Sequence, residues 1–135
     1  MFDLSGKVAI VTGGNGGIGL GIARGLASAG AALLLVGRDA AKTERAVAEL
    51  AATGATASAA IADVTVEADC RGFAEAALQR HGRIDILVNN AGTNWRKPPQ
   101  DYSLEEWRAL IDANLTSTFL ASMAVFPTLQ RQRAG

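Results

Sequence analysis

One glycine-rich run constrains the fold of this 135-residue chain more than any other feature: Thr12-Gly13-Gly14-Asn15-Gly16-Gly17-Ile18-Gly19. It follows a short apolar segment, 8–11, and precedes a helix-like stretch, 20–28. The order of strand, glycine turn and helix predicts a phosphate cradle, because glycine lets the backbone approach a pyrophosphate and the helix offers unpaired N–H groups. Taken alone, the segment leaves open the alternative of a plain flexible turn.

Short apolar runs alternate with longer helix-like stretches along the rest of the chain, which is typical of βαβ units and a mostly parallel sheet. We expect strands at residues 8–11, 31–36, 56–61 and 84–88. We expect helices at 17–29, 39–52, 65–81 and 103–126, with caps at Asp39, Thr65 and Ser103 and an interruption at Pro127. The predicted fold class is α/β, a doubly wound parallel sheet of the Rossmann type with four strands, in one domain over residues 1–135.

Composition excludes several classes of partner. Lys plus Arg and Asp plus Glu number 13 each, so nothing suggests a nucleic acid or an anionic membrane surface. Charged residues and glycine interrupt the apolar runs, so we expect no bilayer-spanning segment, and the amino terminus lacks the features of a signal peptide. One cysteine, Cys70, excludes an internal disulfide and indicates a reducing, cytoplasmic compartment. With one histidine besides, the chain has too few of the usual ligands for a metal site.

Polar side chains follow two of the predicted strands at one edge of the sheet. Asn89-Asn90-Ala91-Gly92 comes after strand 84–88, which a doubly wound sheet places beside strand 8–11, and a dinucleotide binds in the crevice between their ends. These residues are also ordinary turn formers. Asp63 follows strand 56–61 and can accept a hydrogen bond from an adenine amino group, with the Val64 backbone beside it. Its alternative role is to begin the loop before the next helix.

Arg38 follows the second predicted strand, where the type of side chain selects the cofactor. A site for NAD places a carboxylate there for the ribose 2′-hydroxyl, whereas an arginine accommodates a 2′-phosphate. Gly37 stands where the acid is expected, and Asp39 is better used as a helix cap. The pattern favours NADP, with NAD as the alternative.

Asn114 is the most informative single residue of the last helix. It lies among an apolar stripe at helical spacing that is predicted to face inward: Leu104, Trp107, Leu110, Ile111, Leu115, Thr118 and Phe119. An inward amide costs stability unless it is paired. Asn114 therefore either bridges neighbouring backbone or serves a site.

Two other residues with reactive side chains have simpler interpretations. Cys70 shares a helical face with Val66, Phe73 and Ala77, which predicts a small core thiol. His81 is expected at a helix carboxyl terminus, where a cationic ring suits the helix dipole.

Together these residues resemble the classical short-chain dehydrogenase/reductase family. Thr12-Gly13 and, three residues later, Gly17-Ile18-Gly19 match its cofactor motif, and Asn89-Asn90-Ala91-Gly92 matches its second motif. Asp63-Val64 matches its adenine-contact pair, and residues 82–88 are similar to its fourth strand with the lead-in. The resemblance covers the whole chain.

Two further segments refine the resemblance. Asn114-Leu115-Thr116 looks like the helical segment that carries the catalytic asparagine of the family. Asn15-Gly16-Gly17 and residues 93–99 are most similar to members of the gluconate dehydrogenase type, which act on sugars or sugar acids.

The resemblance implies an enzyme at full length, a homo-oligomer that moves a hydride between a nicotinamide cofactor and a small polar carbonyl or alcohol. In this family a tyrosine is the general acid/base, a lysine four residues later lowers its pKa, and a serine holds the substrate oxygen. The asparagine supports a water chain to that lysine, and only its position, Asn114, is matched here. Tyr102, the sole tyrosine, precedes Asn114 and has Glu106 four residues later, so it is predicted to be a loop residue.

The chain stops where the family turns into its fifth strand, so we expect residues 1–135 alone to be inactive. Without that strand, segment 84–88 is predicted to form a bare apolar sheet edge, which favours self-association. Two alternatives to an enzyme stay open: a non-catalytic nucleotide-binding module and an inactive truncated remnant.

Overall fold

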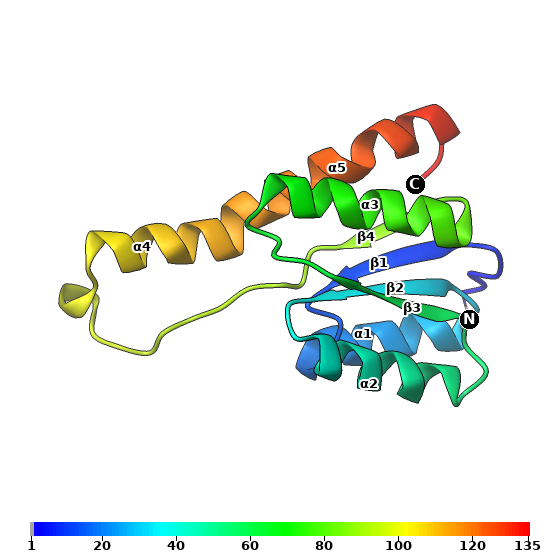
Figure 1. The fold of residues 1–135 in the computed structure, drawn as a ribbon, viewed down its shortest axis with the longest axis horizontal. Helices are drawn as coiled ribbons and strands as arrows, with labels where there is room; N and C mark the ends of the chain where they lie inside the picture. Colours follow the sequence, from blue (N-terminus) through cyan, green and yellow to red (C-terminus); the bar gives the residue numbers. More distant parts are fainter. Residues whose placement is uncertain (1) are drawn as a thin grey trace.

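The structure, a computed structural model, describes residues 2–135 and is built on a four-stranded parallel sheet (Figure 1). The strands are β1 (Val8–Thr12), β2 (Ala32–Gly37), β3 (Ala57–Ile61) and β4 (Ile86–Val88), in the order β3-β2-β1-β4. One face is covered by α1 (Gly17–Ser28) and α2 (Ala40–Ala51), and the other by α3 (Glu67–His81) and α5 (Ser117–Gln132) (Figure 1). The doubly wound α/β prediction is confirmed.

The two central strands are buried on both faces, which explains why they read as continuous apolar runs. Ile10 packs with Phe73 on the side of α3 and α5, while Val11 and Leu35 pack on the side of α1 and α2. Val11 pairs with Leu35 of β2 and with Val88 of β4, so the carboxyl ends of three strands meet at one edge. This packing gives the loops at that edge a rigid base.

The start of α3 differs from the sequence prediction. The helix begins at Glu67 with Val66 at its N-cap, and no side chain caps it, so Thr65 is not the cap. The Thr65 hydroxyl instead donates to Asp63 Oδ1 at 2.7 Å, which closes the turn before the helix. A threonine hydroxyl can form a hydrogen bond within a turn or cap a helix, and here it forms the bond within the turn.

β4 lies at an edge of the sheet, as predicted, but the approach to it is not bare. Gln132, at the end of α5, donates from Nε2 to the Ile84 carbonyl at 2.5 Å and accepts the Ile84 N–H at 3.2 Å. The side-chain amide thus takes the place of a neighbouring strand beside Ile84, which is fully buried. The strand itself begins at Ile86, two residues later than expected.

The last helical segment is longer than predicted. α4 (Leu104–Ile111) continues through a π-helical turn, Asp112–Thr116, into α5, which passes Pro127 and ends at Gln132. Pro127 is exposed, so water can bond to the carbonyl that the proline leaves unpaired. The continuous helix Leu104–Gln132 contains an 18-residue window with a mean hydropathy of 1.4, which by length and composition alone is enough to cross a bilayer, although core helices of soluble proteins pass the same test.

The predicted apolar stripe of this helix does not face the core. Leu104, Trp107, Leu115 and Phe119 are between 56% and 64% exposed. α4 extends past the carboxyl edge of the sheet, away from the other helices (Figure 1). α5 packs against α3 and the sheet through a different face, which holds Ser117, Ala121, Val125 and Thr128.

Candidate functional site

Thr12 and Asn90 fasten the carboxyl ends of β1 and β4 together. The Thr12 hydroxyl donates to the Val88 carbonyl at 3.2 Å and accepts the N–H groups of Asn90 and Ala91, both at 3.1 Å. Asn90 Nδ2 donates back to the carbonyls of Thr12 (3.1 Å) and Gly13 (3.2 Å). The loops that follow the two strands are therefore held at a fixed separation.

The glycine-rich run forms the turn between β1 and α1. Gly13 has a φ of 63°, in the left-handed region that favours glycine, and a Cβ on Gly19 would overlap the Gly13 carbonyl. α1 can therefore begin this close to the turn only without a side chain at position 19. Gly16 is the N-cap of α1, and no side chain caps it, so the first-turn N–H groups are available to an anion. This cradle fits the pyrophosphate of a dinucleotide.

A cavity of about 190 Å³ lies at the carboxyl edge beside this turn. Six residues expected at the site from the sequence line it: Gly13, Arg38, Asp63, Val64, Ala91 and Gly92. Hydrogen bonds from the Thr65 hydroxyl and N–H hold the pKa of Asp63 below its ordinary value, and Arg38 contributes less. Asp63 is therefore ionised at neutral pH and closes the loop after β3, while its contact with an adenine stays a prediction.

Asn114 lies in the π-helical turn and bridges to the loop after β4. Its Nδ2 donates to the carbonyls of Thr93 (2.8 Å) and Leu110 (2.9 Å), and its Oδ1 accepts the Thr93 N–H at 3.2 Å. A Cβ on Gly92 would lie 2.5 Å from Asn114 Oδ1, so a glycine is needed where the helix approaches the loop. The sequence leaves two roles open for Asn114, a bridge between backbone segments and a part in a site. These hydrogen bonds form the bridge, and a catalytic role stays a prediction.

Two members of the glycine-rich run point away from the cavity. Ile18 is 79% exposed, and Asn15 turns to α2, where its Nδ2 donates to Thr43 Oγ1 at 2.9 Å. Sequence reasoning missed Thr43 and its neighbour Lys42, whose side chain lies over Gly16. The available signal was their place in the first turn after Asp39, because that turn begins at the same edge of the sheet.

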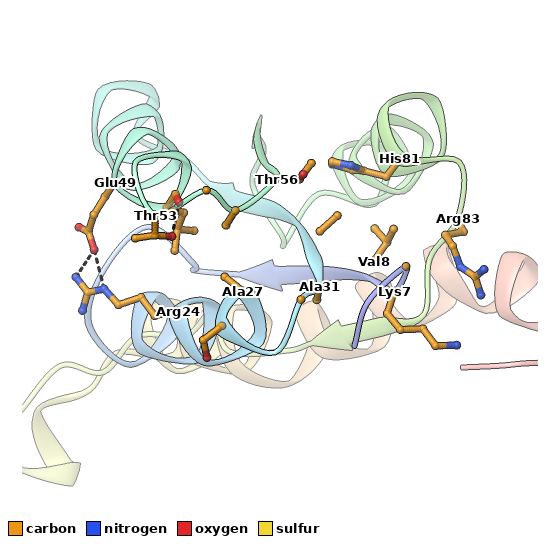
Figure 2. A pocket seen from close by; sticks show the side chains of 17 residues that line it. Lys7, Val8, Arg24, Ala27, Ala31, Glu49, Thr53, Thr56, His81 and Arg83 are labelled. Carbon is orange, nitrogen blue, oxygen red and sulfur yellow. Dashed lines mark hydrogen bonds and ion pairs between the residues drawn. The ribbon is translucent and has the colours of Figure 1, made fainter. Parts of the chain in front are cut away.

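A larger cavity, of about 780 Å³, lies at the opposite, amino edge of the sheet (Figure 2). Its cationic side chains are paired with carboxylates, Arg24 with Glu49 at 2.5 Å and both Lys7 and Arg83 with Asp85. Figure 2 shows the Arg24–Glu49 pair at one side and the Lys7 and Arg83 side chains directed outward at the other. Ligands of open α/β sheets bind outside the carboxyl ends of the strands. We therefore place the site at the smaller cavity.

Three side chains away from this cavity have structural roles. Cys70 is fully buried, and burial raises the pKa of its thiol to about 11, consistent with the predicted core thiol. His81 is the last residue of α3, as expected, but it bonds to Ser58 Oγ at 2.8 Å and burial lowers the pKa of its ring, which favours the neutral form. Tyr102 lies in the loop before α4 and donates to the Trp95 carbonyl, as expected of a loop residue.

Comparison with known protein families identifies the family of the chain that has this geometry. The family model described as short chain dehydrogenase matches residues 7–135. The chain belongs to the short-chain dehydrogenase family. Gluconate 5-dehydrogenase of Gluconobacter oxydans, a relative, is 42% identical over 126 residues, which are 93% of this chain and 49% of the relative. The rhamnolipids biosynthesis 3-oxoacyl-acyl-carrier-protein reductase of Pseudomonas aeruginosa is 40% identical over 130 residues, 96% and 50% of the two chains.

Solved short-chain dehydrogenases share the fold. A metagenomic short-chain oxidoreductase in complex with NADP is 40% identical with a TM-score of 0.91, over 98% of this chain and 60% of that one. A short-chain type dehydrogenase/reductase from Mycobacterium marinum is 35% identical with a TM-score of 0.95, over 99% and 54%. This short-chain dehydrogenase chain thus spans about half the length of the curated relatives it matches.

Proposed function

We propose that this short-chain dehydrogenase chain binds NADPH at the carboxyl edge. We further propose that the full-length protein transfers a hydride between that cofactor and a small polar carbonyl or alcohol, such as a sugar or sugar acid. The observation that carries the proposal is the glycine cradle between β1 and α1, whose first-turn N–H groups no side chain caps. The relative in complex with NADP supports the cofactor, and gluconate 5-dehydrogenase supports the substrate class.

The residues of this chain would hold and orient the cofactor. When bound, the nicotinamide ring supplies or accepts the hydride. The turn from Gly13 to Gly19 binds the pyrophosphate, Asp63 and Val64 face the adenine, and Arg38 takes the 2′-phosphate. Asn114 fixes the loop after β4 through the Thr93 backbone.

Residues 1–135 do not contain the general acid/base of the proposed reaction. The sole tyrosine, Tyr102, has Glu106 four residues later, and Glu106 is held by Lys97 at 2.6 Å. We therefore expect the 135-residue chain to bind NADPH without turnover. A non-catalytic nucleotide-binding module predicts the same binding, whereas an inactive remnant predicts neither a stable fold nor binding.

Titration of the folded chain with NADPH, followed by nucleotide fluorescence, tests the proposal. Saturable binding is the expected result, and a folded chain that binds neither NADPH nor NADH contradicts it. The intact mass of the protein from its own cell then separates an enzyme from a module, because only a longer protein can carry the missing acid/base. Ketone-dependent NADPH oxidation by the 135-residue chain would contradict the assignment of that missing group.

Replacing Arg38 tests the cofactor choice. We expect Arg38→Ala to weaken NADPH binding by about tenfold and NADH binding by less than about twofold, because only NADPH carries the 2′-phosphate that a guanidinium binds. Arg45→Ala, which removes an exposed cation farther along α2, is the control and should change neither affinity. Equal losses for both nucleotides in Arg38→Ala would count against a 2′-phosphate contact.

A further inference from the structure

Lys42 places a second cation beside the glycine-rich turn. It lies in the first turn of α2, where its backbone N–H donates to the cap residue Asp39 at 2.9 Å. Its side chain reaches back over the turn, because a Cβ built on Gly16 would lie 2.8 Å from Lys42 Cε and 2.9 Å from Nζ. The ammonium group therefore lies over Gly16, at the carboxyl edge of the sheet.

A hydrogen-bond network of Asn15, Thr43 and Asp39 holds α2 in the position that makes this contact possible. Asn15 Nδ2 donates to Thr43 Oγ1 at 2.9 Å, and Thr43 Oγ1 donates to the Asp39 carbonyl at 2.7 Å. Thr43 is fully buried. A Cβ on Gly37 would overlap Asn15 Nδ2 and lie 2.7 Å from Thr43 Oγ1. This network therefore leaves no room for the side chain of an Asp or Glu at position 37. It also fixes Lys42, the neighbour of Thr43, against the turn.

Among the described residues, the two cations at this edge, Arg38 and Lys42, form no ion pair within 4 Å, although Asp63 lies near enough to Arg38 for that charge to lower the pKa of the carboxyl. Arg38 lines the cavity at the end of β2, and Lys42 lies over the turn. The carboxylate between them in sequence, Asp39, is bonded to the helix start. Positive charge thus flanks the space between the end of β2 and the glycine-rich turn.

We infer that Lys42 is a second specificity-determining residue for NADPH, which shares the ribose 2′-phosphate with Arg38. The inference rests on the proposed binding of NADPH and adds a residue and a geometry to it. A phosphomonoester carries up to two negative charges near neutral pH, so a second cation stabilises it more than one alone. NADH has a hydroxyl at that position and gains little from an ammonium group there.

Matched variants on α2 test the inference. We expect Lys42→Met, which removes the charge and keeps most of the stem, to weaken NADPH binding by about tenfold and NADH binding by less than about twofold. Lys42→Arg should keep most of the preference for NADPH, and Arg45→Met should change neither affinity. A ratio of NADPH to NADH affinity that is the same before and after Lys42→Met would overturn the inference.

Gly16→Ala tests whether the position of the Lys42 side chain over Gly16 matters. Its φ of 178° is extended backbone that alanine adopts, so the added Cβ acts by displacing the Lys42 side chain. We expect Gly16→Ala to reduce the NADPH preference in the wild-type background and to have no further effect on that preference in Lys42→Ala. A similar reduction in both backgrounds would show that the turn, not Lys42, is responsible, and would overturn the inference.

The same titrations separate this inference from the function on which it rests. If the folded wild-type chain binds neither nucleotide, both are overturned. If it binds NADPH and NADH but Lys42→Met weakens the binding of both by the same factor, only the role of Lys42 is overturned.

Discussion

Asp85 is a nearly buried carboxylate that fastens the amino end of β1 to the segment leading into β4. Its Oδ2 accepts the Val8 N–H at 3.0 Å, and the Arg83 guanidinium binds both of its oxygens, at 2.6 and 2.7 Å. The hydrogen bonds from Arg83 hold the pKa of Asp85 below its ordinary value, against the opposing effect of burial. One side chain thereby sets the spacing of two strands at the edge opposite the candidate site.

This lowered pKa predicts acid sensitivity. The unfolded chain binds a proton at Asp85 near pH 4 and the folded chain binds it lower, so the stabilisation is present above about pH 4 and is lost as pH falls through the folded pKa. We expect Asp85→Asn to lower the free energy of unfolding by about 1.5–3 kcal/mol at neutral pH and to flatten its fall in acid. Thermal unfolding from about pH 7 to pH 3 measures both effects.

The exposed carboxylate of Glu75 provides the control for that experiment. Glu75→Gln should leave the acid dependence of unfolding unchanged. An Asp85→Asn variant with the same loss of stability in acid as the wild type would contradict the assignment.

Which residues could be predicted from sequence depends on how far away their partners lie. The caps at Asp39 and Ser103 were predictable because each bonds within its own first turn. Asp85 and Gln132 were not, since their partners lie 77 and 48 residues away. Lys42 was missed for the same reason, because only the folded chain brings α2 over Gly16.

Among the elements, the π-helical turn decides how the last helix meets the candidate site. Its extra residue per turn lets Asn114 face Thr93 while Leu115 points to solvent. The periodicity of the sequence correctly identified an apolar stripe on this helix, but periodicity does not show whether such a stripe packs against the core or faces solvent. The inward orientation predicted for it was therefore wrong, although the paired amide expected of Asn114 was right.

Removing the Asn114 amide should loosen the loop after β4. We expect Asn114→Ala to lower stability by about 1 kcal/mol, because the Thr93 N–H and carbonyl lose their partner in a partly exposed place. Amide exchange of residues 89–97 should become faster, and that measurement distinguishes a local bridge from a general loss of packing. Asn94→Ala, in the same exposed loop, is the control. Unchanged exchange in Asn114→Ala would contradict the bridge.

The whole molecule combines a neutral net charge with an uncovered apolar surface. Lys plus Arg and Asp plus Glu balance at 13 each, so charge repulsion does not keep copies apart. An exposed stripe runs along α4 and α5, formed by Leu104, Trp107, Leu115, Phe119, Met123 and Phe126. Gln132 bonds to Ile84, which precedes β4, so the edge formed by Ile86–Val88 can also contribute. The stripe adds a second cause to the self-association expected from the sequence.

We predict that the 135-residue chain self-associates through this stripe, because large exposed apolar side chains that follow one another along one helix are typical of an interaction surface. Light scattering coupled to size exclusion should give a mass that rises with concentration. The double variant Phe119→Gln and Met123→Gln should shift the chain towards the monomer. Ile61→Gln, which removes an exposed apolar side chain at the far edge of the sheet, should not. A mass that stays monomeric at every concentration would show that the stripe is not an association surface.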